Sequence, residues 1–68
     1  MQTRQLPARR LIVGDRIKWR GAMFAVAAVE PLPHAAGRVS VRLVNPDTLE
    51  DRTHRMRLDA PVQVVAAN

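Results

Sequence analysis

Apolar residues alternate with polar, mostly cationic residues along two segments of this sequence, and this alternation constrains the fold more than any other feature. In residues 16–20, two apolar residues (Ile17 and Trp19) separate three basic ones. Successive side chains of a β-strand point to opposite faces, so the segment predicts a half-buried strand with an apolar inner face and a cationic outer face. Residues 38–44 repeat the pattern, with valine and leucine at the inward positions.

Turn signals divide the chain into short strands at intervals of about ten residues. Gly21 supplies a hairpin turn, two prolines and a glycine occupy residues 31–37, and Asn45-Pro46-Asp47-Thr48 predicts a type I turn. The predicted strands are residues 16–20, 23–30, 38–44, 49–58 and 62–65. A helix over residues 22–30 is the main alternative because alanine favours helix, but the flanking glycine and prolines favour a strand.

These strands predict an all-β domain, a five-stranded SH3-like barrel over residues 11–68. Residues 1–10 show no sustained period and are predicted to form a flexible basic arm. A chain of 68 residues is one domain near the lower limit for a self-supporting core, and the absence of cysteine excludes disulfides and thiolate metal sites. The apolar run of residues 22–29 falls far short of the roughly 20 residues that cross a bilayer, so a cytoplasmic protein is expected.

The positive charge is concentrated at the N-terminal end. Residues 1–20 contain six basic residues and one acidic residue, whereas residues 21–68 contain five of each. A localised excess attracts polyanions, while the same charges scattered over a surface would mainly aid solubility. Cations at alternate strand positions lie about 7 Å apart, close to the spacing of phosphates along a nucleic-acid strand. The sequence therefore indicates a nucleic-acid-binding accessory protein that contacts the phosphate backbone of DNA or RNA with low base specificity.

The candidate phosphate-binding residues fall into three groups. They are Arg16, Lys18 and Arg20 on the outer face of the first strand, Arg4, Arg9 and Arg10 in the arm, and Arg38, Arg42, Arg55 and Arg57 on the third and fourth strands. The alternative for the first group is a solvated strand face, or a positive edge that resists aggregation. In the third group, Glu50 and Asp51 can instead pair with Arg42 or Arg52. Pairing is favoured for Arg52, and binding for Arg55 and Arg57.

Aromatic residues and histidines give little support to other chemistry. Trp19 and Phe24 both fall at inward positions, so a place in the core is favoured over a stacking platform for bases. His34 in the proline-rich loop and His54 in the fourth strand lack the spaced cysteines or carboxylates of a metal site. No nucleophile–base pair or glycine-rich phosphate loop is present, so neither catalysis nor a cofactor is expected.

A protein-interaction module is the alternative function. The second strand is predicted to turn Phe24, Val26 and Ala28 inward, yet its other face is apolar as well. That other face consists of Met23, Ala25, Ala27 and Val29. We expect it to be covered by the N-terminal segment, by a partner protein or by a second copy of the chain.

A series of short motifs runs through the predicted strands. They are Val13-Gly14-Asp15-Arg16-Ile17, Arg20-Gly21, Phe24-Ala25-Val26 and Val29-Glu30, then Arg38-Val39-Ser40-Val41-Arg42-Leu43, the turn at residues 45–48 and the strand at residues 50–53. The series resembles the opening of the N-terminal, KOW-type SH3-like domain of bacterial elongation factor P, over about residues 11–65. The resemblance implies a KOW or SH3-like barrel, a fold used for RNA, DNA, ribosomal and protein contacts.

The sequence also departs from that family. The family's loop between the second and third strands is longer, glycine-rich and carries a lysine at its tip, whereas residues 32–37 are short and contain no lysine. The two further barrel domains of the factor are absent from these 68 residues. A translation factor of that kind is therefore not expected.

Overall fold

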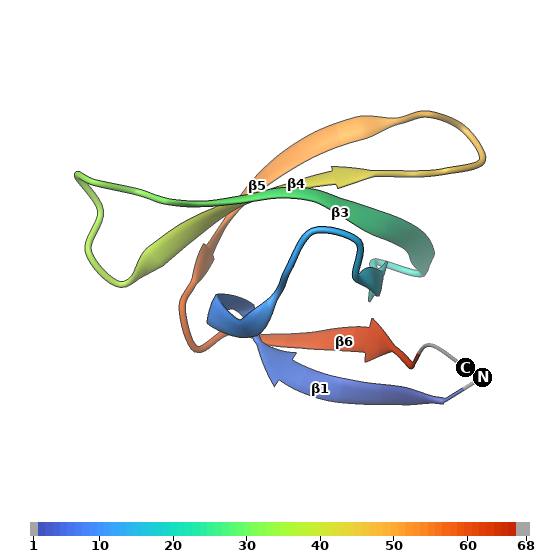
Figure 1. Ribbon diagram of the computed structural model, residues 1–68, viewed down its shortest axis with the longest axis horizontal. Coiled ribbons are helices and arrows are strands. Elements are labelled where there is room, and N and C mark those ends of the chain that lie inside the picture. Colours follow the sequence, from blue (N-terminus) through green and yellow to red (C-terminus); the bar gives the residue numbers. More distant parts are fainter. Residues whose placement is uncertain (1, 67–68) are drawn as a thin grey trace.

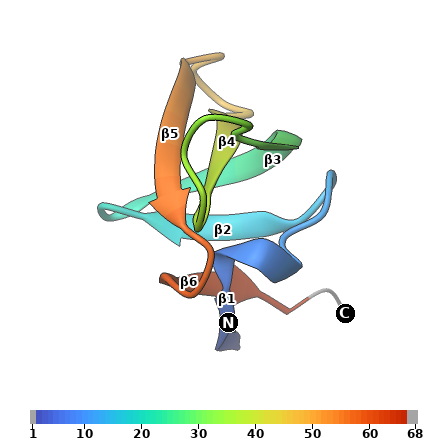
Figure 2. The same ribbon diagram turned by 90° about the vertical axis from the view of Figure 1, so that its left-hand side faces the viewer.

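The chain folds into one antiparallel sheet of six strands that curls on itself (Figure 1). A computed structural model describes residues 2–66. Its elements are β1 (Thr3–Pro7), the 3-10 helix η1 (Ala8–Arg10), β2 (Arg16–Trp19), β3 (Ala22–Pro31), β4 (Arg38–Val44), β5 (Asp51–Arg57) and β6 (Pro61–Val65). The strand order across the sheet is β1-β6-β2-β3-β4-β5. The curl places β3, β4 and β5 in one layer over β1 and β6, and the core lies between them (Figures 1 and 2).

The all-β, SH3-like prediction is confirmed, with six strands in place of five. Strand β4 has the predicted bounds, and the other predicted strands differ only at their ends. Within residues 2–66, no helix is long and apolar enough to span a membrane.

The predicted flexible arm over residues 1–10 needs correction, because residues 3–10 form a strand and a 3-10 helix, while Met1 lies outside the described residues. Thr3–Pro7 pairs along its whole length with β6, so that Leu6 lies opposite Val62. Leu6 packs against the core, and Ala8 is fully buried within it. Leu6 and Ala8 are the apolar residues near the middle of this segment, and two such residues are too short a pattern to predict a strand. As an edge strand, β1 also accommodates Pro7, which has no N–H to donate.

The core consists of apolar side chains from the inner positions of the strands. The buried residues are Ala8, Leu11, Ile17, Phe24, Val26, Val39, Val41, Leu43, Met56, Val62 and Val64. Val39, Val41 and Leu43 occupy the predicted inward positions on β4. None of the polar or charged side chains in residues 2–66 is buried, so all the cations are available at the surface or in surface ion pairs.

A β-bulge in β3 changes which residues of that strand face the core. Val26 lies opposite Leu43, but the next pair joins Ala28 to Arg42, which leaves Ala27 as the extra residue. Val29 then lies opposite Val41 and packs against the core. The prediction that Ala28 faces inward and Val29 outward is therefore wrong, because β3 is apolar on both faces and its alternation cannot reveal a shift of register.

Two turns hold the strand ends as predicted from their residue types. The Arg20-Gly21 turn has positive φ at both residues, 52° and 81°, which is the backbone geometry of a type I′ hairpin. In the turn after β4, the Asn45 side-chain oxygen accepts hydrogen bonds from the N–H groups of Asp47 (2.9 Å) and Thr48 (3.3 Å). This bonding explains why asparagine suits the first position of that turn.

Candidate nucleic-acid interface

Strand β2 presents two of the predicted cations on the outer face of the sheet. Ile17 is buried opposite Phe24, so Arg16 and Lys18 on either side of it project outward, opposite Ala25 and Met23. Two residues of a strand span about 7 Å. Arg20 does not share this face, because it lies in the hairpin turn beyond the end of β2.

The ladder between β4 and β5 gathers the four predicted cations of the C-terminal half. Arg38 lies directly opposite Arg57, Ser40 opposite Arg55, and Arg42 opposite Thr53. All these positions alternate with buried residues of β4, so the cations share the outer face. The two strands thus bring together residues that are up to 19 positions apart in the sequence.

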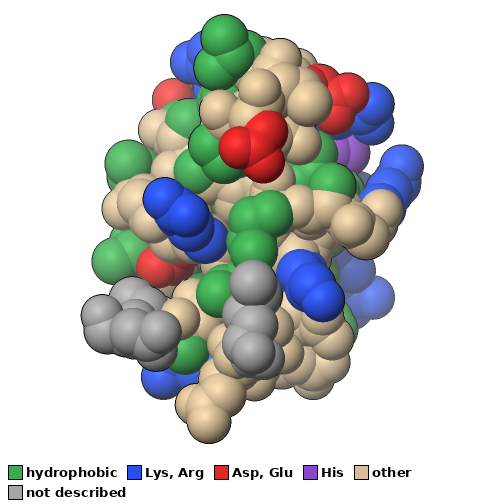
Figure 3. Space-filling view, turned by 90° about the vertical axis from the view of Figure 1, so that its right-hand side faces the viewer, with side chains coloured by type: hydrophobic (Ala, Val, Ile, Leu, Met, Phe, Trp, Pro, Cys, Tyr) green, Lys and Arg blue, Asp and Glu red, His purple; other side chains and the backbone are tan. Residues whose placement is uncertain are grey.

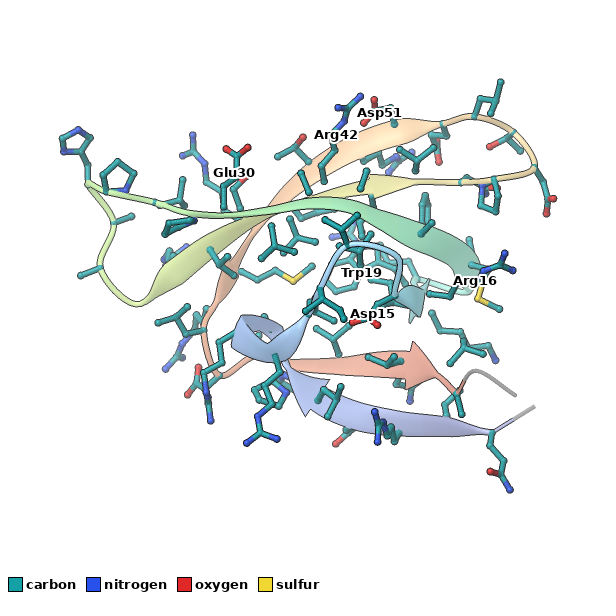
Figure 4. The ribbon with its side chains drawn as sticks, viewed as in Figure 1. Asp15, Arg16, Trp19, Glu30, Arg42 and Asp51 are labelled. Atoms are coloured by element: carbon teal, nitrogen blue, oxygen red, sulfur yellow. The ribbon has the colours of Figure 1, made fainter. Side chains whose placement is uncertain are left out.

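Ion pairs neutralise part of this second group. Arg42 forms a two-pronged hydrogen-bonded pair with Asp51, whose Oδ1 and Oδ2 accept from Arg42 Nε at 3.0 and 3.1 Å (Figure 4). The bonds from Arg42 hold the pKa of Asp51 below its ordinary value. Arg57 Nε lies 3.5 Å from a carboxylate oxygen of Asp59. The predicted pairing of Glu50 with Arg52 is confirmed at 2.8 Å, as is that of Asp51 with Arg42.

The remaining cations make no ion pair within residues 2–66. They are Arg4, Arg9, Arg10, Arg16, Lys18, Arg20, Arg38 and Arg55. All six cations of the N-terminal third belong to this group. The charge imbalance seen in the sequence therefore persists in the folded domain, where ion pairs involve only cations of the C-terminal half.

The cations predicted in the N-terminal arm lie at two separate places. Arg4 on β1 is opposite Val64 and lines a hollow of about 430 Å³ together with Asp15 and Arg16. Arg9 and Arg10 are exposed on η1, where the N–H of Arg9 donates to the carbonyl of Leu58 (3.0 Å). Figure 3 shows the end of the molecule that carries the termini, with its basic side chains spread around it rather than gathered in one patch.

The predicted protein-binding face of β3 is interrupted by the bulge. Met23 and Ala25 lie on the outer face, Ala27 is the extra residue, and Val29 packs inward. The exposed apolar pair that sequence reasoning missed is Ile12 and Val13, which are 66% and 65% exposed in the loop before β2. Leu11 beside them is buried. Because residues 11–13 are all apolar, the sequence does not indicate which of them faces the solvent.

The aromatic residues occupy the predicted inward positions. Phe24 is buried, while Trp19 is only partly buried and packs against His54 with ring centroids 5.1 Å apart. His34 is exposed in the loop after β3 and lines a hollow of about 260 Å³ with Arg55. In the described part of the chain, no three His, Asp or Glu side chains are grouped so as to hold a metal ion.

Comparison with known proteins supports the fold assignment. No protein-family model matches the sequence, and no curated protein sequence matches it either. Similar solved structures include a translation initiation factor eIF-5A family protein from Naegleria fowleri (12% identity, TM-score 0.76, covering 94% of this chain and 47% of that one). Another is eukaryotic translation initiation factor 5A from Methanococcus jannaschii (17% identity, TM-score 0.71, covering 91% and 49%).

These likenesses show a shared fold. The chain spans about half the length of either structure. The resemblance to the SH3-like domain of a translation factor, first seen in the motifs of residues 11–65, is thereby confirmed at the level of the fold.

Proposed function

We propose that this domain binds nucleic acid through phosphate groups, using the outer faces of β2 and of the β4–β5 ladder. The observation that carries the proposal is the set of outer-face cations that have no carboxylate partner among residues 2–66, namely Arg16, Lys18, Arg38 and Arg55. Arg38 even lies opposite a second cation, Arg57. Like charges placed directly opposite each other destabilise a sheet, and a polyanion would relieve that repulsion.

The surface between the two groups of cations allows a polymer to approach closely. Strand β3 separates them, and it contributes the small residues Ala25 and Ala28 to the outer face. Ala28 lies in a hollow of about 180 Å³, which is also lined by the hydroxyl residues Ser40 and Thr53, by Arg42 and by the carboxylate of Glu30. Hydroxyl groups and arginines are usual phosphate ligands, and such contacts position a polymer without reading its sequence.

RNA is the polymer that we propose to test first. The two similar structures named above bear the names of translation initiation factors, and translation is an RNA-dependent process. Their identity to this chain is below 20%, so the choice of polymer depends on experiment. We propose binding rather than catalysis, since the described hollows are open and charged side chains that line them, such as Arg4, Arg16 and Glu30, are exposed to solvent.

The test is an NMR titration of the labelled protein with a single-stranded RNA, a duplex RNA and a duplex DNA of equal length. We expect amide shifts in β2, β4 and β5 that shrink as salt rises. Four phosphate contacts on a single strand predict that affinity falls about 50-fold between 50 and 200 mM salt. If none of the polymers causes shifts, or if the shifts ignore salt, the proposed function is wrong.

A second candidate function is binding of a protein partner through Ile12 and Val13. Their loop is held firmly, because Asp15 Oδ2 accepts from the N–H of Ile12 (3.0 Å) and the N–H of Gly14 donates to the carbonyl of Val26 (2.9 Å). A fixed loop that exposes two apolar side chains is typical of a contact surface. Sedimentation of the wild type and of the I12S/V13S variant tests the self-association form of this idea, which predicts a concentration-dependent mass only for the wild type.

A further inference from the structure

A shallow hollow beside the β2–β3 hairpin combines the one tryptophan of the chain with two arginines. It measures about 140 Å³ and is lined by Trp19, Arg20, Ala22, Phe24, Glu50 and Arg52. Pockets that enclose a drug-sized ligand begin at roughly 300 Å³. This hollow is therefore suited to a single flat group rather than to a whole small molecule.

Trp19 is placed differently from a residue that serves only the core. It is partly exposed, whereas Phe24 next to it is 4% exposed. Its Nε1 is buried, yet it has no hydrogen-bond partner within the described residues, and the same holds for Nε2 of the neighbouring His54. A tryptophan in a settled core position usually satisfies its N–H. Trp19 packs against the core, but that packing does not account for its unpartnered N–H.

Arg20 occupies a backbone position that disfavours it. Its φ is 52°, in the left-handed region, at the first of two such residues in the turn. A type I′ turn prefers Asn, Asp or Gly at that position, and other residues there are strained. The arginine lines the hollow next to Trp19. Strain of this kind is common where a side chain serves binding, so Arg20 is a candidate ligand-binding residue.

The charges around the hollow favour an anion next to the aromatic surface. Arg20 makes no ion pair within residues 2–66, and Arg52 pairs through one NH2 group with Glu50 at 2.8 Å. A guanidinium carries five N–H donors, so Arg52 keeps donors for a second acceptor. Two arginines against one carboxylate leave the rim positive.

We propose that the hollow binds an unpaired nucleobase, which stacks on the exposed part of Trp19 while Arg20 and Arg52 contact the phosphates beside it. The proposal rests on the proposed function and adds to it a preference for single-stranded nucleic acid. Bases inside a duplex are not free to stack on a side chain, whereas splayed bases of a single strand are. Trp19 lies on the inner side of the sheet, away from Arg42 and Asp51 (Figure 4).

The lone tryptophan makes the test direct, because all indole emission comes from this site. The protein is titrated with a ten-nucleotide single-stranded RNA and, separately, with an abasic strand of the same length. Binding of each labelled strand is followed independently by fluorescence anisotropy. We expect both to bind, and only the strand that carries bases to quench Trp19.

The variant R20N separates this site from folding and from general charge. Asparagine followed by glycine suits a type I′ turn, so the variant is expected to fold at least as well as the wild type. Its affinity for the RNA should fall about fivefold or more beyond that of R9N, which removes an unpaired exposed cation from η1.

The outcomes distinguish the two proposals. If the RNA binds without changing Trp19 emission, or if the abasic strand binds as tightly, base stacking is overturned while phosphate binding stands. If R20N behaves like R9N, Arg20 has no special part in the site and the proposal fails. If neither strand binds, the proposed function fails together with the stacking site.

Discussion

The outer face of β2 and the outer face of the β4–β5 ladder both carry cations at alternate positions, but they differ in how those charges are balanced. Arg16 and Lys18 lie opposite the uncharged Ala25 and Met23. On the ladder, Arg42 and Arg57 are paired with Asp51 and Asp59. The ladder has four outer-face cations and β2 has two, but each face has only two cations without an ion pair among residues 2–66.

The difference teaches that spacing and availability of charge are separate properties. Acidic residues lie only a few positions from the arginines of β5 in the sequence. In the folded chain, Asp51 and Asp59 lie close enough to Arg42 and Arg57 to form ion pairs with them. Asp15 is the one acidic residue among residues 1–20, and its carboxylate accepts a backbone N–H at 3.0 Å. The cations of β2 therefore make no ion pair within the described part of the chain, and we propose that they bind an external anion. The predictions below test this contrast.

Charge reversal gives the largest expected effect. The double variant R16E/K18E should lower the affinity for single-stranded RNA by about 50-fold or more at 100 mM salt, because two attractive contacts become repulsive. R38E/R55E should produce a loss of similar size, since it also removes two unpaired cations. Anisotropy titrations measure both variants. A loss confined to one of them would assign the phosphate contacts to that face alone.

The bulge in β3 places Ala28 rather than Val29 beside Arg42 on the outer face that separates the two groups of cations. V29S should lower the free energy of unfolding by about 1–2 kcal/mol, since a partly buried core side chain is lost. A28S should change it by less than about 0.5 kcal/mol. Urea unfolding measures the free energy of unfolding of both variants, and equal losses in V29S and A28S would contradict the assigned register.

Arg38 and Arg57 face each other across the β4–β5 ladder. If they are kept for binding, their repulsion should lower the stability of the fold. R38E turns a like-charge pair into an opposite-charge pair and should raise the free energy of unfolding by a few tenths of a kcal/mol. The same variant should bind RNA more weakly. Thermal unfolding and anisotropy together check it, and a variant that is less stable would show that Arg38 is held by contacts other than those described.

The Arg42–Asp51 pair gives the smallest expected effect. Arg42 lowers the pKa of Asp51, so the pair stabilises the fold above the ordinary pKa range of an aspartate, and this contribution disappears as pH falls through the lowered value. D51N should therefore melt slightly below the wild type at pH 7, and the gap should close in acid. A gap that stays constant down to pH 2 would show that the carboxylate charge is not what matters.

The sequence predicted the strands whose alternation is clear. The bounds of β4 were predicted without error because Val39, Val41 and Leu43 alternate with polar residues and a strong turn follows. Strand β1 was missed because its place in the sheet depends on pairing with β6, about 60 positions away in the chain. The bulge was missed because residues 22–29 are all apolar, so no change in the alternation of apolar and polar residues marks the shift of register.

The candidate site was predictable in part for similar physical reasons. The sequence identified the cations and anticipated two of the ion pairs, since Glu50 and Asp51 lie close to their partners. It placed Trp19 on the inner side of β2, as the register confirms. It could not show that Trp19 remains partly exposed beside Arg20 and Arg52, because the start of β3 and the start of β5 meet there only in the folded chain.

The most direct test of the central claim compares salt dependence in matched variants. Affinity for a single-stranded RNA is measured from 50 to 200 mM salt for the wild type, for R16Q/K18Q, and for R42Q/D51N, which removes one charge of each sign. If unpaired cations contact the phosphates, R16Q/K18Q should reduce the slope of log affinity against log salt by about 1.4, and R42Q/D51N should leave it unchanged. A slope that is equal in all three proteins, or that changes only in R42Q/D51N, would contradict the account.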